Sequence, residues 1–75
     1  MPNINVNGEL LGAHRNARGL SRAGLSHALL PARISEETIK RAEKGIVNPK
    51  KLEVISKFFQ TNSSIFFSKV VDLVD

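Results

Sequence analysis

Signals that begin and end helices recur at short intervals along this chain, and they restrict it to a series of short helices. A serine or asparagine side chain can cap a helix start, a glycine can adopt the left-handed conformation that follows a helix end, and a proline prevents continuation. Such signals stand in the order Asn7, Gly19, Ser21, Pro31, Ser35, Gly45 and Asn48-Pro49. They predict one helix over residues 8–18, a second that stops near residue 29 or 30, a third between residues 35 and 45, and a fourth after residue 48. Thr61 or Asn62 can cap a last helix.

The chain is short and has no cysteine, so no disulfide can restrain its 75 residues. Its two histidines, His14 and His27, do not make a zinc cluster, and we expect no metal and no cofactor. We therefore predict an all-α domain over residues 8–68 that helix packing stabilises. Residues 1–7 are expected to form a strand-like or disordered arm, and residues 69–75 a tail.

Positive charge is concentrated in the middle of the chain. Ten of the eleven basic residues but only four of the seven acidic ones lie between residues 15 and 57, and the net charge of the whole chain is +4. A basic patch of this density attracts a polyanion, although it is equally typical of a solubilising surface. Charge alone therefore does not decide the function.

The helix expected between residues 35 and 45 has two unlike sides. Lys40, Arg41 and Lys44 fall on one side, and Ile39 and Ala42 on the other. This arrangement suits a helix laid into the major groove of DNA, because a small apolar side holds it to the domain while polar side chains face the base edges.

An ordered set of motifs from Leu11 to Phe66 resembles the phage-repressor family, the lambda repressor and Cro type of helix-turn-helix proteins that also occurs among bacterial regulators. The motifs are Arg15, Gly19-Leu20-Ser21, Leu25, Ile34-Ser35, Thr38-Ile39, Glu43-Lys44-Gly45 and Asn48-Pro49. The resemblance implies a compact five-helix domain that binds double-stranded DNA, with a helix-turn-helix over residues 21–45. It also implies an ion pair between Arg15 and Glu43, and Glu43 needs such a partner because a carboxylate near a helix C-terminus opposes the helix dipole.

The resemblance also assigns DNA contacts. The base-reading residues it implies are Ser35, Glu36, Glu37, Lys40 and Arg41, and the phosphate contacts are Arg22, Lys44, Asn48 and Lys50. Ser21 and Asn48 stand at helix starts, where free backbone N–H groups can also hold a phosphate. For Glu36 and Glu37 the alternative role is to stabilise the helix start, and Lys40 suits a phosphate better than a base.

The chain departs from the family pattern in several places. The connection between the second and third helices is about three residues longer than usual, and Arg33 within it is either a further phosphate contact or solvent-facing. Gly24 replaces the usual acidic residue, and Ser26 stands where a small alanine is usual. His14 occupies a position that is usually apolar, and we expect it to be half-buried.

Apolar residues near the end of the chain recur at helical spacing. They are either core residues or a dimer interface, and an interface formed by Phe66, Val70, Leu73 and Val74 is slightly favoured. A homodimer would bind a pseudo-palindromic operator. The function predicted is therefore a dimeric transcriptional regulator such as a phage or small bacterial repressor. The alternative is a helix-turn-helix module that binds a protein, as in antitoxins or antirepressors.

Other functions are not expected. The two histidines lie on different predicted helices without a carboxylate pair, nucleophile motif or phosphate loop, so we predict no enzyme activity. The longest purely apolar runs are three residues and no signal peptide is apparent, which predicts a cytoplasmic protein without a membrane partner. No ligand-sensing domain is present, so no small-molecule ligand is expected.

Overall fold

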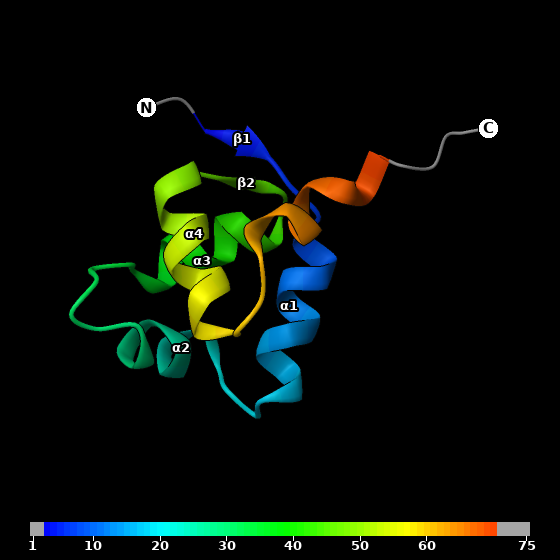
Figure 1. Ribbon diagram of the computed structural model, residues 1–75. Helices are drawn as coiled ribbons and strands as arrows, with labels where there is room; N and C mark the ends of the chain where they lie inside the picture. Colours follow the sequence, from blue (N-terminus) through cyan, green and yellow to red (C-terminus); the bar gives the residue numbers. More distant parts are fainter. Residues whose placement is uncertain (1–2, 71–75) are drawn as a thin grey trace.

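Four α-helices, one 3₁₀-helix and a small sheet make up most of residues 3–70, the part that the computed structural model describes; side chains are described as far as residue 67 (Figure 1). The elements in chain order are β1 (Ile4–Asn5), α1 (Gly8–Ala17), α2 (Arg22–Ala28), α3 (Glu36–Glu43), β2 (Ile46–Val47), α4 (Pro49–Phe58) and the 3₁₀-helix η1 (Ser63–Val70). The chain is thus mostly helical, as predicted.

The helix starts follow from side-chain caps at the positions that the sequence indicates. The side-chain oxygens of Asn7, Ser21, Ser35 and Asn48 each accept a hydrogen bond from a backbone N–H in the first turn of the helix that follows, over 2.8 to 3.1 Å. Gly19 and Gly45, with φ of 68° and 109°, adopt the left-handed conformation just after α1 and α3. Local signals therefore set the bounds of these helices.

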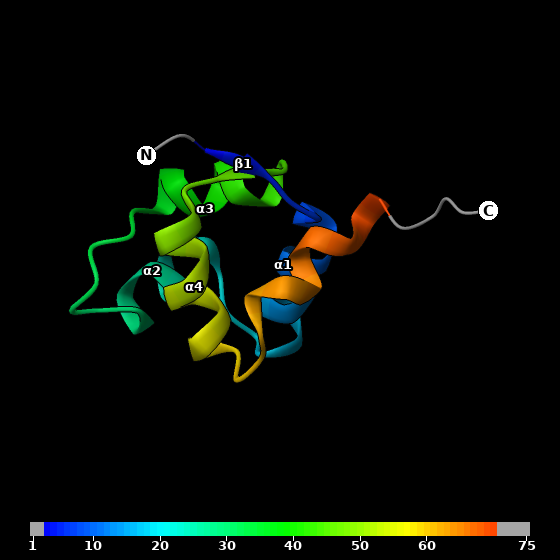
Figure 2. The same cartoon turned by 45° about the horizontal axis from the view of Figure 1, so that its top comes forward.

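The prediction of an all-α fold needs correction, because β1 and β2 form a two-stranded antiparallel sheet. Ile4 is paired with Val47 and Asn5 with Ile46. Figures 1 and 2 show the two strands side by side along one edge of the molecule. The left-handed turn at Gly45 brings the chain back past the N-terminal segment, where the Gly45 carbonyl accepts a hydrogen bond from the N–H of Val6. The arm is therefore strand-like, and Val6 is fully buried.

The prediction of five α-helices is also wrong, since the described residues contain four. The last helical segment, η1, is a 3₁₀-helix, in which the N–H of Ile65 donates to the carbonyl of Asn62 three residues earlier. The Asn62 side chain accepts a hydrogen bond from the N–H of Ser64, which is the start signal expected at this position.

Phe66 is fully buried in the core of the single chain, so the prediction that it lies at a dimer interface needs correction. Its side chain is fully buried, and its ring meets the edge of His14 with 5.8 Å between ring centroids. His14 also stacks on Phe59 at 5.3 Å and is half-buried, as expected. Of the other interface candidates, Leu73 and Val74 lie outside the described residues, as does the side chain of Val70.

Candidate nucleic-acid interface

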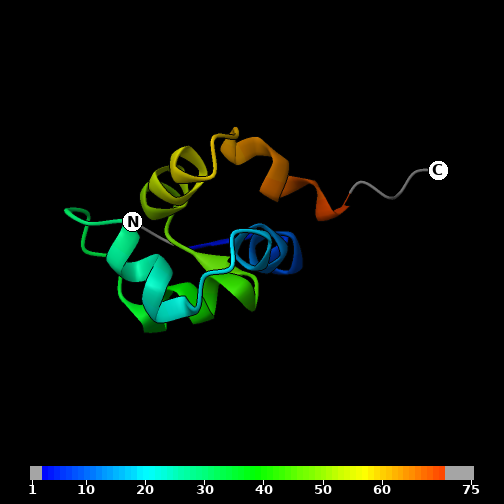
Figure 3. The ribbon, with the colours of Figure 1, turned by 90° about the horizontal axis from the view of Figure 1, so that it is seen from below.

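Helix α3 is held from behind by Ile39 and Ala42, which are both fully buried. Its opposite side carries exposed side chains. We call these residues, together with the two caps, the α3 face: Ser35, Glu36, Glu37, Lys40, Arg41 and Lys44. The α3 face thus contains all five predicted base-reading residues. Figure 3 shows α2 and α3 together on one side of the molecule, with α4 and η1 on the other.

The charged side chains of the α3 face are placed favourably for the helix dipole, with acids at the N-terminal end and bases at the C-terminal end. Glu36 and Glu37 stand in the first turn, and Lys40 and Arg41 in the last. The ion pair between Arg41 and Glu37 is weak, since 3.7 Å separates Arg41 Nε from Glu37 Oε2 and 70% and 61% of the two side chains are exposed. The Arg41 guanidinium can therefore leave Glu37 for a stronger acceptor. The Ser35 hydroxyl already has a partner within the helix, because it accepts a hydrogen bond from the N–H of Thr38.

The carboxylate of Glu43 joins three helices. Arg15 of α1 donates from Nε to Glu43 Oε2 over 2.6 Å and from Nη2 to Oε1 over 3.2 Å, and its Nη1 donates to the carbonyl of Leu20. The ion pair that the family resemblance implies is therefore present, with 12% and 8% of the two side chains exposed. The hydrogen bonds to Glu43, together with its negative charge, raise the pKa of Arg15 above its ordinary value despite burial. Arg15 is consequently charged at every pH near neutrality.

Arg22 is the second partner of Glu43, and the sequence did not indicate this. Its Nε donates to Glu43 Oε1 over 3.1 Å, and 43% of its side chain is exposed. Arg22 also lines an open hollow between the start of α2 and the α3 face, with Ser35, Glu36, Glu37 and Lys40. The predicted phosphate contact at Arg22 is thus adjacent to the predicted base-reading residues. Arg22 and Glu43 are 21 residues apart, and no local periodicity indicates that the start of α2 meets the end of α3.

The two helix starts predicted to hold phosphates are both capped by their own side chains. The Ser21 hydroxyl accepts from the N–H of Gly24, and the Asn48 side chain accepts from the N–H of Lys50. Each cap occupies one backbone donor, whereas the start of α2 has four that lack a partner within the helix and the start of α4 has three, because Pro49 has no N–H. Capping and phosphate binding are therefore compatible at both positions.

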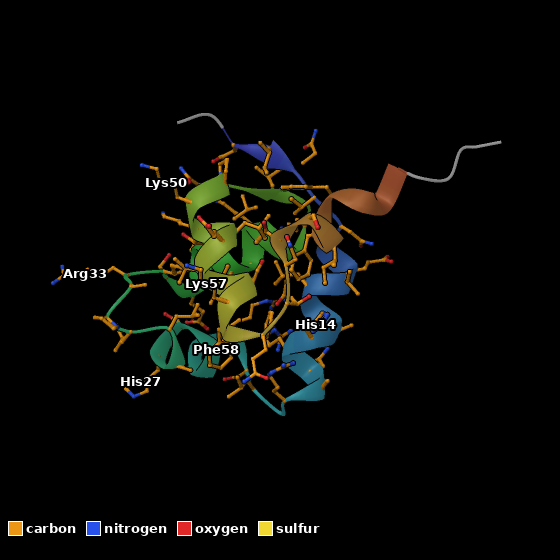
Figure 4. The ribbon with its side chains drawn as sticks, viewed as in Figure 1. His14, His27, Arg33, Lys50, Lys57 and Phe58 are labelled. Carbon is orange, nitrogen blue, oxygen red and sulfur yellow. The ribbon has the colours of Figure 1, made fainter. Side chains whose placement is uncertain are left out.

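The remaining cationic candidates lie at the border of the domain. Arg33 and Lys50 are both exposed and project from the same edge of the molecule in Figure 4, Arg33 from the loop between α2 and α3 and Lys50 from the start of α4. Lys44 is the exposed C-cap of α3. The structure thus brings Arg22 next to the α3 face and places Arg33 and Lys50 further out.

Comparison of the chain with protein-family models, with curated proteins and with solved structures found no match. The α3 face and the cations around it must therefore be interpreted from their own chemistry.

None of the helices in the described part of the chain has the length and apolar character that crossing a bilayer requires. Among the described residues, no three histidine, cysteine or acidic side chains gather in a way that could hold a metal ion.

Proposed function

We propose that the protein is a sequence-specific transcriptional regulator that binds double-stranded DNA as a dimer. In this proposal α2 and α3 form a helix-turn-helix like that of the lambda repressor and Cro type of proteins. Helix α3 enters the major groove, and α2 lies across it near the DNA backbone.

The exposed α3 face, with three cationic side chains in its second half, is the observation that carries this proposal. An α-helix with its side chains is about 10–12 Å across, which matches a major groove about 12 Å wide. Ile39 and Ala42 fasten α3 to the domain, and Lys40, Arg41 and Lys44 remain exposed on its other side. A helix anchored in this way can enter the groove without unfolding any part of the domain.

Arg41 is best suited to read a base among these residues. Its guanidinium can donate two parallel hydrogen bonds to O6 and N7 of guanine, which discriminates against other bases by about 1–3 kcal/mol. The weak contact with Glu37 orients Arg41 without committing it. Glu36 and Glu37 can accept from N4 of cytosine, and Lys40 can serve a phosphate.

Phosphate contacts would fix the position of α3 along the groove relative to the base pairs. Arg22, Arg33, Lys44 and Lys50 supply the positive charge, and the starts of α2 and α4 at Ser21 and Asn48 supply backbone donors. Because Glu43 holds Arg22, this guanidinium is oriented before DNA arrives. Such order reduces the entropy that binding must remove.

The test is a fluorescence-anisotropy titration of the full chain with duplex DNA at several salt concentrations. Phosphate contacts from Arg22, Arg33, Lys44 and Lys50 predict that log K falls with log salt at a slope near −3.6 per protomer, about −0.9 for each phosphate, and a contact from Lys40 would steepen the slope to about −4.5. A flat salt response, or no binding at low salt, would contradict the proposal and favour the protein-interaction module.

Sequence specificity needs its own comparison within the same assay. Arg41→Ala should relax the preference at one base pair in each half-site and leave binding to random-sequence DNA nearly unchanged. Lys50→Ala is the matched control, since it should weaken all sequences about equally and make the salt slope shallower by about 0.9. An Arg41→Ala variant with unaltered preference would show that the α3 face is not the reading surface.

A further inference from the structure

The α2–α3 loop, residues 29–34, is longer than a helix-turn-helix requires and is anchored at both ends. Leu29 and Ile34 are buried, with 5% and 3% exposed. The N–H of Ala32 donates to the carbonyl of Leu29, and the N–H of Ile34 donates to the carbonyl of Ala32. Between these anchors Leu30 and Arg33 are exposed, and Arg33 extends away from the domain (Figure 4). The loop is thus a fixed projection beside the start of α3.

Ser26 makes a short hydrogen bond to the end of this loop. Its hydroxyl donates to the carbonyl of Ile34 over 2.6 Å, which joins the middle of α2 to the residue just before the α3 cap. Alanine or glycine at this position could not make the bond, because neither has a side-chain donor. The bond fixes the peptide unit that follows Ile34, and with it the direction in which the loop meets α3.

Arg33 depends on the loop for its position. It forms no hydrogen bond or ion pair with any other residue that the structure describes, and it precedes Ile34 directly. Ser26 and Arg33 line the same open hollow of about 310 Å³, together with Leu30, Ile34 and Ser35. The backbone that carries Arg33 is therefore held on one side by the Ser26 hydroxyl and on the other by the bonds between residues 29 and 34.

We infer that Ser26 is a positioning residue whose hydroxyl holds the α2–α3 loop so that Arg33 meets a phosphate beside the groove that α3 enters. This inference rests on the proposed function. A loop fixed in the free protein loses little conformational freedom on binding, whereas a loop without the Ser26 bond must be ordered by the DNA. Removing the Ser26 bond should therefore weaken DNA binding, and this weakening should occur only when Arg33 is present.

A double-mutant cycle tests the inference. Affinities of the full-length wild type, Ser26→Ala, Arg33→Ala and the double variant are measured for a duplex about 21 base pairs long, selected for binding from random DNA. We expect Ser26→Ala to weaken binding roughly fivefold, as the loss of one hydrogen bond predicts. Arg33→Ala should make the salt slope shallower by about 0.9. In the Arg33→Ala background, Ser26→Ala should have almost no further effect.

Two variants separate positioning from a general loss of stability. Ser56→Ala removes a hydroxyl that donates to the carbonyl of Leu52 over 2.8 Å within α4, and Ser56 belongs neither to the α2–α3 loop nor to the α3 face. It should lower the unfolding temperature without weakening DNA binding. Ser26→Cys keeps a side chain of similar size with a weaker donor, and it should weaken binding partially. This variant replaces Ser26→Ala in the cycle if the alanine variant does not fold.

The outcomes distinguish the inference from the proposed function. Equal losses from removing the Ser26 hydroxyl with and without Arg33 would overturn the inference, as would an unchanged affinity. In both cases the wild type still binds DNA in a salt-dependent way, and the proposed function stands. A wild type that does not bind duplex DNA at low salt would overturn both.

Discussion

The carboxylate of Glu43 is shared by two guanidinium groups from different helices. Arg15 binds it from α1 within the partly buried interior, and Arg22 binds it from α2 near solvent. Glu43 itself ends α3, where a carboxylate opposes the helix dipole. One side chain therefore fixes three helices relative to one another while two positive charges offset its unfavourable position.

Replacing Glu43 should destabilise the fold more than replacing the exposed acid Glu53 or the half-exposed Arg22. We expect Glu43→Gln to lower the free energy of unfolding by about 2–3 kcal/mol, because Arg15 would remain as a mostly buried charge without an ionic partner. Urea denaturation followed by circular dichroism measures this change. Because the pKa of Arg15 is raised, its contribution is fully present at neutral pH and is lost as the pH rises through the raised value.

Two variants serve as controls for this prediction. Glu53→Gln alters an exposed acid of α4 and should change the free energy of unfolding by less than about 0.5 kcal/mol. Arg22→Ala should lower it by less than about 1 kcal/mol, because the Arg22 side chain is 43% exposed. Similar losses for Glu43→Gln and Glu53→Gln would show that Glu43 does not organise the three helices.

At the scale of elements, α1 and α3 approach each other through the glycines of α1. A Cβ atom on Gly8 would overlap the backbone carbonyl of Glu43 at the end of α3, whereas a Cβ atom on Gly12 would lie 3.6 Å from the Glu43 side chain, an ordinary contact. Gly8 is buried at the start of α1. The two glycines therefore have different roles, although they stand one turn apart on the same helix.

Alanine at these two glycines should have effects of opposite sign. Gly8→Ala should destabilise the protein by about 1–3 kcal/mol, since it forces α1 away from α3. Gly12→Ala should stabilise it by up to about 1 kcal/mol, since alanine favours the helix and finds space. Thermal unfolding of both variants measures the difference. A destabilising Gly12→Ala would indicate that the Glu43 side chain has no freedom to adjust.

Element bounds could be predicted from the sequence because their causes are local. A cap such as Ser35 and a left-handed glycine such as Gly45 act within a few residues, so each helix start was found from its own neighbourhood. The sheet between β1 and β2 was not predicted, because it joins residues about forty positions apart through two residues in each strand. Neither its pairing nor the Arg22–Glu43 bond leaves a periodic pattern in the sequence.

The candidate site also combines features that the local sequence predicts with features that depend on tertiary packing. The buried side of α3 at Ile39 and Ala42 follows from helical spacing, and the structure has it as expected. Phe66 has the same apolar spacing as a surface stripe, and only the tertiary packing against His14 shows that it is a core residue. Ser26 could be recognised as unusual, but its partner Ile34 depends on how the loop folds back.

At the scale of the whole molecule, the proposed function leaves one copy of the chain with only a short recognition helix for DNA. The eight residues of α3 span about 12 Å, which covers only a few base pairs of a single major groove. Selection of bound sites from random DNA should therefore yield two half-sites related by approximate two-fold symmetry, with centres about 34 Å apart. The proposed dimer would engage both half-sites from one side of the duplex. Recovery of a single half-site without a symmetric counterpart would show that the protein binds as a monomer.

The N–H of Asn7 donates to the carbonyl of Phe66 over 2.6 Å, and the N–H of Val6 donates to that of Gly45. During synthesis on the ribosome, Val6 therefore lacks this partner until residue 45 has left the exit tunnel, and Asn7 lacks its partner until residue 66 has left it. Chains interrupted before residue 45 would leave Val6 exposed and without its backbone partner, so such truncated copies should be degraded faster in the cell than copies that include residue 66.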